Sequence, residues 1–322
     1  MIHALKWIKR HLVLSIVTGM VVGLFVGSFF DTRPLSSLVT AISFMMVYPM
    51  MVTLDFSSLM KKGNYKLQLV AQLINFVYLP MLAFGFGLLF FPGEVYLRLA
   101  ILLIALLPTS GMTVSWTVMS KGNAPEAIRM IVIGLMLGGL LAPLYIGVLL
   151  GESIALPFNE IFTQILVIVF IPMLLGVLTQ KILRRKYGDE RFKTSIRPLF
   201  PLASTFFVVL LITFVMSLRS EMLLSNPTTI LRIIIPIIIG YVIMIASVHF
   251  IGTRLFSFEN RVALVNGTVV RALSPALAIA VTAFDSIGPE VALVVALAFI
   301  VQVQLAAYYT RWNIARHEKA KT

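Results

Sequence analysis

Long apolar segments fill most of the sequence and constrain its fold more than any other feature. The chain has 322 residues, of which 59% are hydrophobic and only 12% are charged. A soluble domain is about half apolar and roughly a quarter charged. An α-helix needs about 20 apolar residues to cross the hydrocarbon core of a bilayer. The composition therefore predicts an all-α polytopic membrane protein, and it excludes a collagen, a disordered tail, a disulfide-stapled secreted module and an ordinary soluble enzyme.

Polar residues divide the chain into ten apolar segments, most of them about 20–25 residues long. They cover about 11–30, 35–54, 67–91, 96–120, 126–150, 158–180, 198–218, 229–251, 261–284 and 288–310. We predict a single membrane domain over 1–322. Its parts are a first five-helix repeat over 11–150, a second repeat that begins within 151–180 and runs to 310, a cytoplasmic inter-helix loop over 181–197 and a cytoplasmic tail over 311–322.

The basic residues predict the orientation of the ten segments. With ten crossings, 21 of the 26 lysines and arginines fall on the side that holds both termini. The opposite side holds only Arg33, Arg98, Arg219 and Arg232. Because basic residues concentrate on the cytoplasmic side, both termini are expected in the cytoplasm and the protein in the inner membrane. The formal charge of +13 therefore indicates membrane orientation, and we expect no nucleic-acid partner.

Prolines recur at membrane depth in the two halves of the chain. Pro49, Pro80 and Pro108 lie in segments two, three and four, and the second half matches them with Pro201, Pro236 and Pro275 in segments seven, eight and nine. Five segments are an odd number, so the second copy must be inverted relative to the first. Inverted repeats with interrupted helices at matching positions are typical of secondary transporters, although proline is also common in membrane helices generally.

Segment four carries the first predicted interruption. Pro108 removes a backbone donor, and Gly111 relaxes the chain three residues later. Such a break persists in a membrane only where it lines a cavity or is buried in protein. Four hydroxyls accompany it and are predicted to bind substrate: Thr109, Ser110, Thr113 and Ser115. The alternative is a simple proline kink whose hydroxyls bond back to their own helix.

Segment nine carries the matching interruption at Pro275, and it contains Arg271. Arg271 lies ten residues beyond Arg261, which places it roughly 15 Å deep. A charge at the bilayer centre costs at least about 2.5–3.5 kcal/mol, yet all 13 acids lie in loops or near the ends of segments. We expect Arg271 to bind a negative or strongly polar substrate with Asn75, Asn266 and Ser274; the alternative is that it caps its own half-helix.

Several kinds of chemistry have no residues to support them. Cysteine is absent, so disulfides, thiolate metal sites and thiol nucleophiles are excluded. The four histidines are scattered, and no metal site, cofactor site or catalytic motif is recognisable. An intramembrane enzyme would need a carboxylate pair, a nucleophile or a metal at depth, so we expect no enzyme.

Several stretches resemble the bile acid:sodium symporter superfamily, which includes arsenite-efflux permeases. They are Tyr48–Phe56, Asn75–Pro80, Pro108–Gly122 and Leu277–Val281, and the third and fourth are similar to the arsenite-permease branch. The resemblance implies ten helices in two inverted five-helix repeats, with discontinuous helices four and nine crossing near the substrate.

The chain departs from both ligand sets of that superfamily. Arsenite permeases carry a cysteine where this chain has Thr109 and a glutamate where it has Ala276. The position of the sodium symporters' asparagine in span four is Val114, and their span-nine Glu and Gln fall near Val269 and Leu273. Asn75 and Thr113 remain as possible weak sodium ligands.

The sequence therefore predicts a secondary active transporter that moves a small anion or polar solute by alternating access. Its partners would be that small molecule or ion and the lipid bilayer. Three alternatives stay open: an arsenite or related oxyanion efflux permease, a sodium-coupled organic-anion importer, and an intramembrane enzyme. Substrate, direction, coupling ion and oligomeric state do not follow from the residues.

Overall fold

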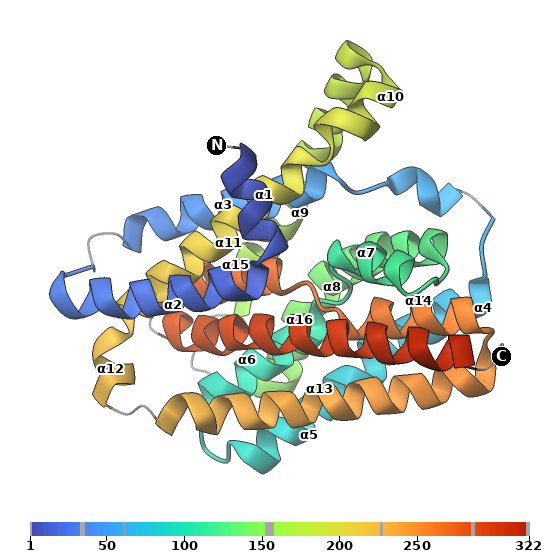
Figure 1. Ribbon diagram of the computed structural model, residues 1–322. Helices are drawn as coiled ribbons and strands as arrows, with labels where there is room; N and C mark the ends of the chain where they lie inside the picture. Colours follow the sequence, from blue (N-terminus) through green and yellow to red (C-terminus); the bar gives the residue numbers. More distant parts are fainter. Residues whose placement is uncertain are drawn as a thin grey trace. The chain divides into compact units, whose positions relative to one another are not determined.

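The protein is helical throughout the part of the chain that the computed structural model describes, which covers residues 2–32, 36–60, 62–151, 158–225, 228–284 and 287–319 (Figure 1). No strand occurs in these ranges, so the predicted all-α class is confirmed. Some residues that were counted in the sequence predictions lie outside these ranges. They are the basic residues Arg33, Lys61 and Lys321 and the acidic residues Glu152 and Asp285.

Within the described ranges, eight helices are long and apolar enough to cross a membrane. Two further apolar helices are shorter, over Leu38–Val52 and Val95–Leu106. A polytopic membrane protein is therefore supported, while the ten crossings and the inverted repeats stay predictions. The short helices fall in predicted segments two and four, and the second of them ends where the chain leaves the helical conformation.

The chain forms two compact units, and each combines helices from both halves of the sequence. The first unit comprises Met1–Leu54, Ala155–Arg232 and Ser274–Ala296, and the second comprises Asp55–Ile154, Ile233–Leu273 and Leu297–Thr322. Segments one, two, six and seven thus contribute to the first unit. Segments three, four, five and eight, with parts of nine and ten, contribute to the second.

The first unit is built around α11, which packs against α1, α2 and α3, while α3 also packs against α9. Its helices are α1 (Ile2–Arg10), α2 (Leu12–Phe29), α3 (Ser36–Val52), α9 (Phe158–Tyr187), α10 (Asp189–Arg191), η4 (Phe192–Ile196), α11 (Leu199–Leu218), α12 (Ser220–Ser225), nearly all of α15 (Leu273–Ala283) and the start of α16 (Gly288–Lys319).

Small residues bring α2 and α11 together. Gly19, Gly23 and Gly27 are spaced by four residues and face α11, where added Cβ atoms would collide with residues such as Thr213 and Ser217. Such stripes let helix backbones approach closely in membranes.

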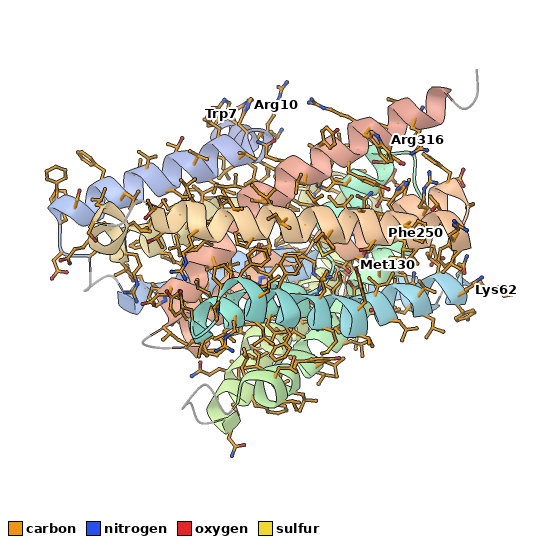
Figure 2. All side chains as sticks on the ribbon, turned by 90° about the horizontal axis from the view of Figure 1, so that it is seen from below. Trp7, Arg10, Lys62, Met130, Phe250 and Arg316 are labelled. Atoms are coloured by element: carbon orange, nitrogen blue, oxygen red, sulfur yellow. The ribbon has the colours of Figure 1, made fainter. Side chains whose placement is uncertain are left out.

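On α1, Trp7 and Arg10 point outward from the ribbon (Figure 2), which suits a short amphipathic helix at a polar boundary.

Residues 181–197, predicted as a loop, are helical over most of their length. Helix α9 continues to Tyr187 because its basic residues are good helix formers. Gly188 then takes a φ of 82°, a left-handed conformation that suits glycine and ends the helix. Arg197 donates to Thr53 O at 2.7 Å and so satisfies a carbonyl just beyond α3.

The second unit is organised around α8 (Ala124–Leu150), which packs against α4, α6, α7 and α14. Its other helices are η2 (Phe56–Met60), α4 (Tyr65–Leu73), η3 (Ile74–Tyr78), α5 (Leu79–Phe90), α6 (Val95–Leu106), α7 (Met112–Met119), most of α13 (Thr228–Leu255), α14 (Phe258–Val269) and the rest of α16. Most prolines do not break these helices: Pro143 and Pro236 lie inside continuous ones.

Pro80 instead accompanies a π-helical turn. The segment η3 widens the helix over Ile74–Tyr78, and α5 follows with Pro80 in its first turn. Because proline has no N–H, the carbonyl of Phe76 loses its partner four residues on. The hydroxyl of Tyr145 donates to this carbonyl instead. The turn places Asn75, which is fully buried, inside the second unit; π-turns of this kind often occur at functional sites.

Candidate functional site

The first interruption separates α6, which ends at Leu106, from α7, which begins at Met112. The chain between them contains Pro108 and the buried Thr109, whose φ of 58° is left-handed and unfavourable for a β-branched residue. On α8, an added Cβ at Gly138 would lie 2.9 Å from Pro108 Cδ. Glycine there lets α8 approach the interruption closely.

The second interruption separates α14, which ends at Val269, from α15, which begins at Leu273 (Figure 1). Only three residues lie outside the helices, and Arg271 is the middle one. Pro275 is not itself the break: it falls in the first turn of α15, where a helix needs no backbone donor.

The two interrupted segments hydrogen-bond directly to each other. Ser110 N–H donates to Val270 O at 2.8 Å, and Ala272 N–H donates to Leu107 O at 2.9 Å. This reciprocal pair is like a single rung of a sheet, and it satisfies backbone groups that have no helical partner. We call residues 107–111 and 270–272 together the crossing. The crossing lies within the second unit.

Threonine hydroxyls add to these backbone bonds. Thr109 Oγ1 donates to Gly267 O at 2.6 Å, which ties the strained residue to the last turn of α14. Thr113 Oγ1 lies 3.3 Å from Asn266 O and 3.4 Å from Val270 O, so it makes longer contacts with the same turn. These hydroxyls bond across the crossing, which a kink that bonds only to its own helix would not do.

Arg271 lies at the centre of the crossing and is 1% exposed. Its Nε donates to Ile104 O at 3.2 Å, and its Nη2 donates to Ala105 O. Its Nη1 donates to Thr268 O at 2.8 Å and to Asn75 Oδ1 at 2.6 Å. Three of these acceptors are carbonyls in the last turns of α6 and α14. The guanidinium therefore caps both half-helices that end at the crossing, where a cation is favoured by the helix dipole.

Sequence reasoning did not assign Gln302 and Tyr241 to the site. Gln302 Oε1 accepts from the backbone N–H of Arg271 at 2.7 Å, and its Nε2 donates to the Arg271 carbonyl at 3.1 Å. Tyr241 donates to the same Gln302 oxygen at 2.9 Å. The side-chain amide of Gln302 thus bonds both backbone groups of Arg271, as a neighbouring strand would do in a sheet. An amide within an otherwise apolar segment was the available signal.

Most of the predicted site residues lie together at this crossing. Asn75, Thr109, Ser110, Thr113, Asn266 and Arg271 are all buried. Ser115 is exposed on α7, and Ser274 is partly exposed and belongs to the first unit. Among the described residues, the Nδ2 atoms of Asn75 and Asn266 have no hydrogen-bond partner although they are buried. Two buried side-chain amide groups beside the crossing could therefore still donate hydrogen bonds.

Described residues of the second unit line a small cavity beside Arg271 and a larger cavity. The small one, of about 70 Å³, has apolar walls from α5, α6 and α13, and Tyr241 and Arg271 also line it. The larger one, of about 740 Å³, lies along α13, α14 and α16, and its lining includes Phe250 and Arg316 (Figure 2) but not Arg271. No group of three His, Cys, Asp or Glu residues that could hold a metal occurs in the described ranges.

A second buried arginine was not predicted as part of any site. Arg129 pairs with Glu126 at 2.6 Å near the start of α8. Its Nε donates to Ser58 O and its Nη2 to Lys62 O, both at 3.1 Å. Glu126 also accepts from Gln68 Nε2 at 2.6 Å. These contacts fix the start of α8 to the segment before α4 and to Gln68 of α4.

Comparisons with known proteins identify a family model and several relatives that are similar to this chain. Residues 40–226 match the model of the Sodium Bile acid symporter family. The arsenical-resistance protein Acr3 of Corynebacterium glutamicum is 25% identical over 264 residues, which cover 74% of this chain and 70% of that protein. Acr3 of Alkaliphilus metalliredigens is 24% identical over 255 residues, 72% of this chain and 71% of that protein.

A vertebrate protein shows similarity over a shorter stretch. Sodium/bile acid cotransporter 7 of Danio rerio is 28% identical over 136 residues, which cover 38% of this chain and 40% of that protein. The family match spans more than half of the chain and includes the first interruption. The chain therefore belongs to the Sodium Bile acid symporter family of membrane transporters.

Proposed function

We propose that the protein is a secondary active transporter of the inner membrane, with both termini cytoplasmic, that moves a small anion or polar solute by alternating access. The observation that carries the proposal is the crossing: two interrupted helices bond to each other around a buried arginine. Irregular backbone at membrane depth lies where it is buried in protein or lines a cavity, and transporter sites are built from such half-helices.

The charge of Arg271 favours an anion. Its acceptors are neutral carbonyls and an amide, so no carboxylate among them cancels the positive charge. Since a guanidinium stays protonated in proteins, the crossing keeps a positive potential. An anion about 10 Å away would gain roughly 1.7 kcal/mol at an effective dielectric constant of about 20.

Substrate contact is expected on the exposed side of α7. Ser115 and Met119 are exposed and four residues apart, so they share one face of α7, and the exposed Gly111 lies four residues earlier, directly before the helix. Ser115 offers the hydroxyl on this face, while Thr109, Ser110 and Thr113 hold the backbone behind it. The two compact units are candidates for the bodies that move during alternating access.

Flux into proteoliposomes tests the proposal. Purified protein should accelerate the uptake of at least one small organic or inorganic anion over protein-free vesicles. Ser115→Val should reduce this uptake, whereas Val118→Leu, a neighbouring exposed position on α7, should not. Equal uptake with and without protein across arsenite and a panel of organic anions would contradict the proposal.

Arsenite export is the second candidate, favoured by the similarity to two Acr3 proteins. This chain has no cysteine, so arsenic would have to be carried through oxygen and nitrogen contacts alone. Inverted vesicles that accumulate arsenite in preference to organic anions would support this candidate. Accumulation of organic anions without arsenite would remove it.

A further inference from the structure

The name of the family implies a sodium ion, and the oxygens around Arg271 test whether such an ion fits the crossing. The guanidinium donates only to oxygen atoms: three backbone carbonyls and the amide oxygen of Asn75. Carbonyl and amide oxygens are the ligands that hard cations prefer in proteins. These four oxygens therefore form a site that suits a cation, and the guanidinium of Arg271 already occupies it.

The position of the carbonyls strengthens this interpretation. Ile104 and Ala105 lie in the last turn of α6, and Thr268 lies in the last turn of α14. The last carbonyls of a helix have no partner within it and carry the negative end of its dipole. Two such ends therefore converge on one buried positive charge. Transporters use half-helix C-terminal ends of this kind to bind sodium ions or protons.

We propose that the guanidinium of Arg271 is the fixed cation of this crossing, and that the crossing binds no sodium ion while Arg271 is present. Asn75 Oδ1, predicted as a sodium ligand, already accepts from Arg271, and Thr113 donates to carbonyls of the α14 end. A sodium ion at these oxygens would be repelled by the positive charge of the Arg271 guanidinium. The inference rests on the proposed transporter function and deepens it, because it makes transport at this site independent of a sodium ion.

The same geometry predicts what a variant without the charge should do. Arg271→Ala leaves the three carbonyls and Asn75 Oδ1 without a donor. The neighbouring cavity of about 70 Å³ adds room for a small cation with water. The variant should therefore gain an affinity for small cations that the wild-type protein lacks. Arg271→Lys keeps a positive charge at the site and serves as the matched control.

Thermal unfolding of purified protein tests this inference without knowledge of the substrate. In choline chloride, Arg271→Ala should unfold roughly 6–10 °C below the wild type. Sodium chloride at equal ionic strength, or millimolar methylguanidinium chloride, should raise its Tm saturably. The Tm of the wild type and of Arg271→Lys should be the same in sodium and choline. A Tm of Arg271→Ala that neither cation raises would overturn the inference.

Direct binding of radioactive sodium to the wild type gives a second readout, in which Arg271 is left unchanged and only folded Asn75→Leu protein, checked by its elution as a single species, is used for comparison. We expect no saturable binding to the wild type. Saturable binding that Asn75→Leu abolishes would overturn the inference, because it would place a sodium ion at the oxygens of Arg271. Failure of the flux assay would bear on the proposed function alone, since neither measurement here depends on transport.

Discussion

Two arginines are buried in the second unit, and the protein satisfies them differently. Arg129 faces the carboxylate of Glu126 at 2.6 Å and two carbonyls from the segment before α4. Arg271 faces three carbonyls and one amide, with no carboxylate among these acceptors. Arg129 and Glu126 form a neutral pair near the start of α8, whereas Arg271 leaves a positive charge at the crossing.

The difference shows how a membrane protein can bury a charge for two purposes. A carboxylate partner cancels the charge and concentrates the interaction in one contact, which suits a contact that holds two segments of the chain together. Carbonyls at helix ends stabilise the charge without cancelling it and spread the interaction over several contacts. Only the second arrangement leaves an uncancelled positive charge, which under the proposed function would attract an anionic substrate. The crossing and the Glu126 network should therefore respond differently to substitution.

Of the substitutions Glu126→Gln, Asn75→Asp and Thr109→Val, the first should have the largest effect on stability. The substitution keeps the shape of the side chain but leaves the buried guanidinium of Arg129 without this carboxylate, which costs about 3–5 kcal/mol. Unfolding in mixed detergent micelles measures the loss. The double variant Glu126→Gln/Arg129→Met should lose less than the sum of the two single variants. A Glu126→Gln variant as stable as the wild type would mean that the ion pair with Arg129 does not stabilise the fold.

Asn75→Asp should convert the Arg271 arrangement into the Arg129 arrangement. The new carboxylate would pair with the guanidinium and cancel its charge, so stability should be kept while uptake of an anion falls. A loss of roughly 1.7 kcal/mol in attraction corresponds to a decrease of about tenfold or more at low substrate concentration. Flux in proteoliposomes measures it, with Asn75→Gln as the neutral control. Unchanged anion uptake would show that the charge of Arg271 does not act on the substrate.

Thr109→Val should have a small effect, because the contacts of the crossing are shared among many groups. It removes the 2.6 Å bond to Gly267 O and keeps the β-branched shape, so unfolding should become easier by about 0.5–1.5 kcal/mol. Thr113→Val removes two longer contacts and should cost less. A loss for Thr109→Val as large as that for Glu126→Gln would contradict a shared arrangement.

The sequence predicted where helices are interrupted better than what holds the interruptions together. Pro108, Gly111 and the hydroxyls around them signalled the first break, and the chain leaves the helical conformation there. The second break was expected at Pro275, but the structure places it at residues 270–272, because proline is tolerated in the first turn of α15. The pairing of Arg271 with Ile104 and Ala105 could not be predicted, because carbonyls occur at every residue and only the fold brings these two to the guanidinium.

Other parts of the site were missed for similar physical reasons. Glu126 was interpreted as an acid near a segment end, although its spacing of three residues from Arg129 is a recognised pairing distance on a helix. Gln302 looked like an isolated amide, but it replaces the backbone partners of Arg271. Helices α3 and α6 are short in the structure, so apolar length alone did not establish ten crossings.

Hydrogen exchange in lipid nanodiscs is the most direct test of the crossing. The amides of Ser110 and Ala272 bond to the opposite segment, so peptides that cover 107–111 and 270–272 should be strongly protected although neither is helical. Arg271→Met should deprotect both peptides together and leave the start of α8 protected. Rapid exchange of either peptide in the wild type, or deprotection confined to 270–272 in the variant, would contradict the account.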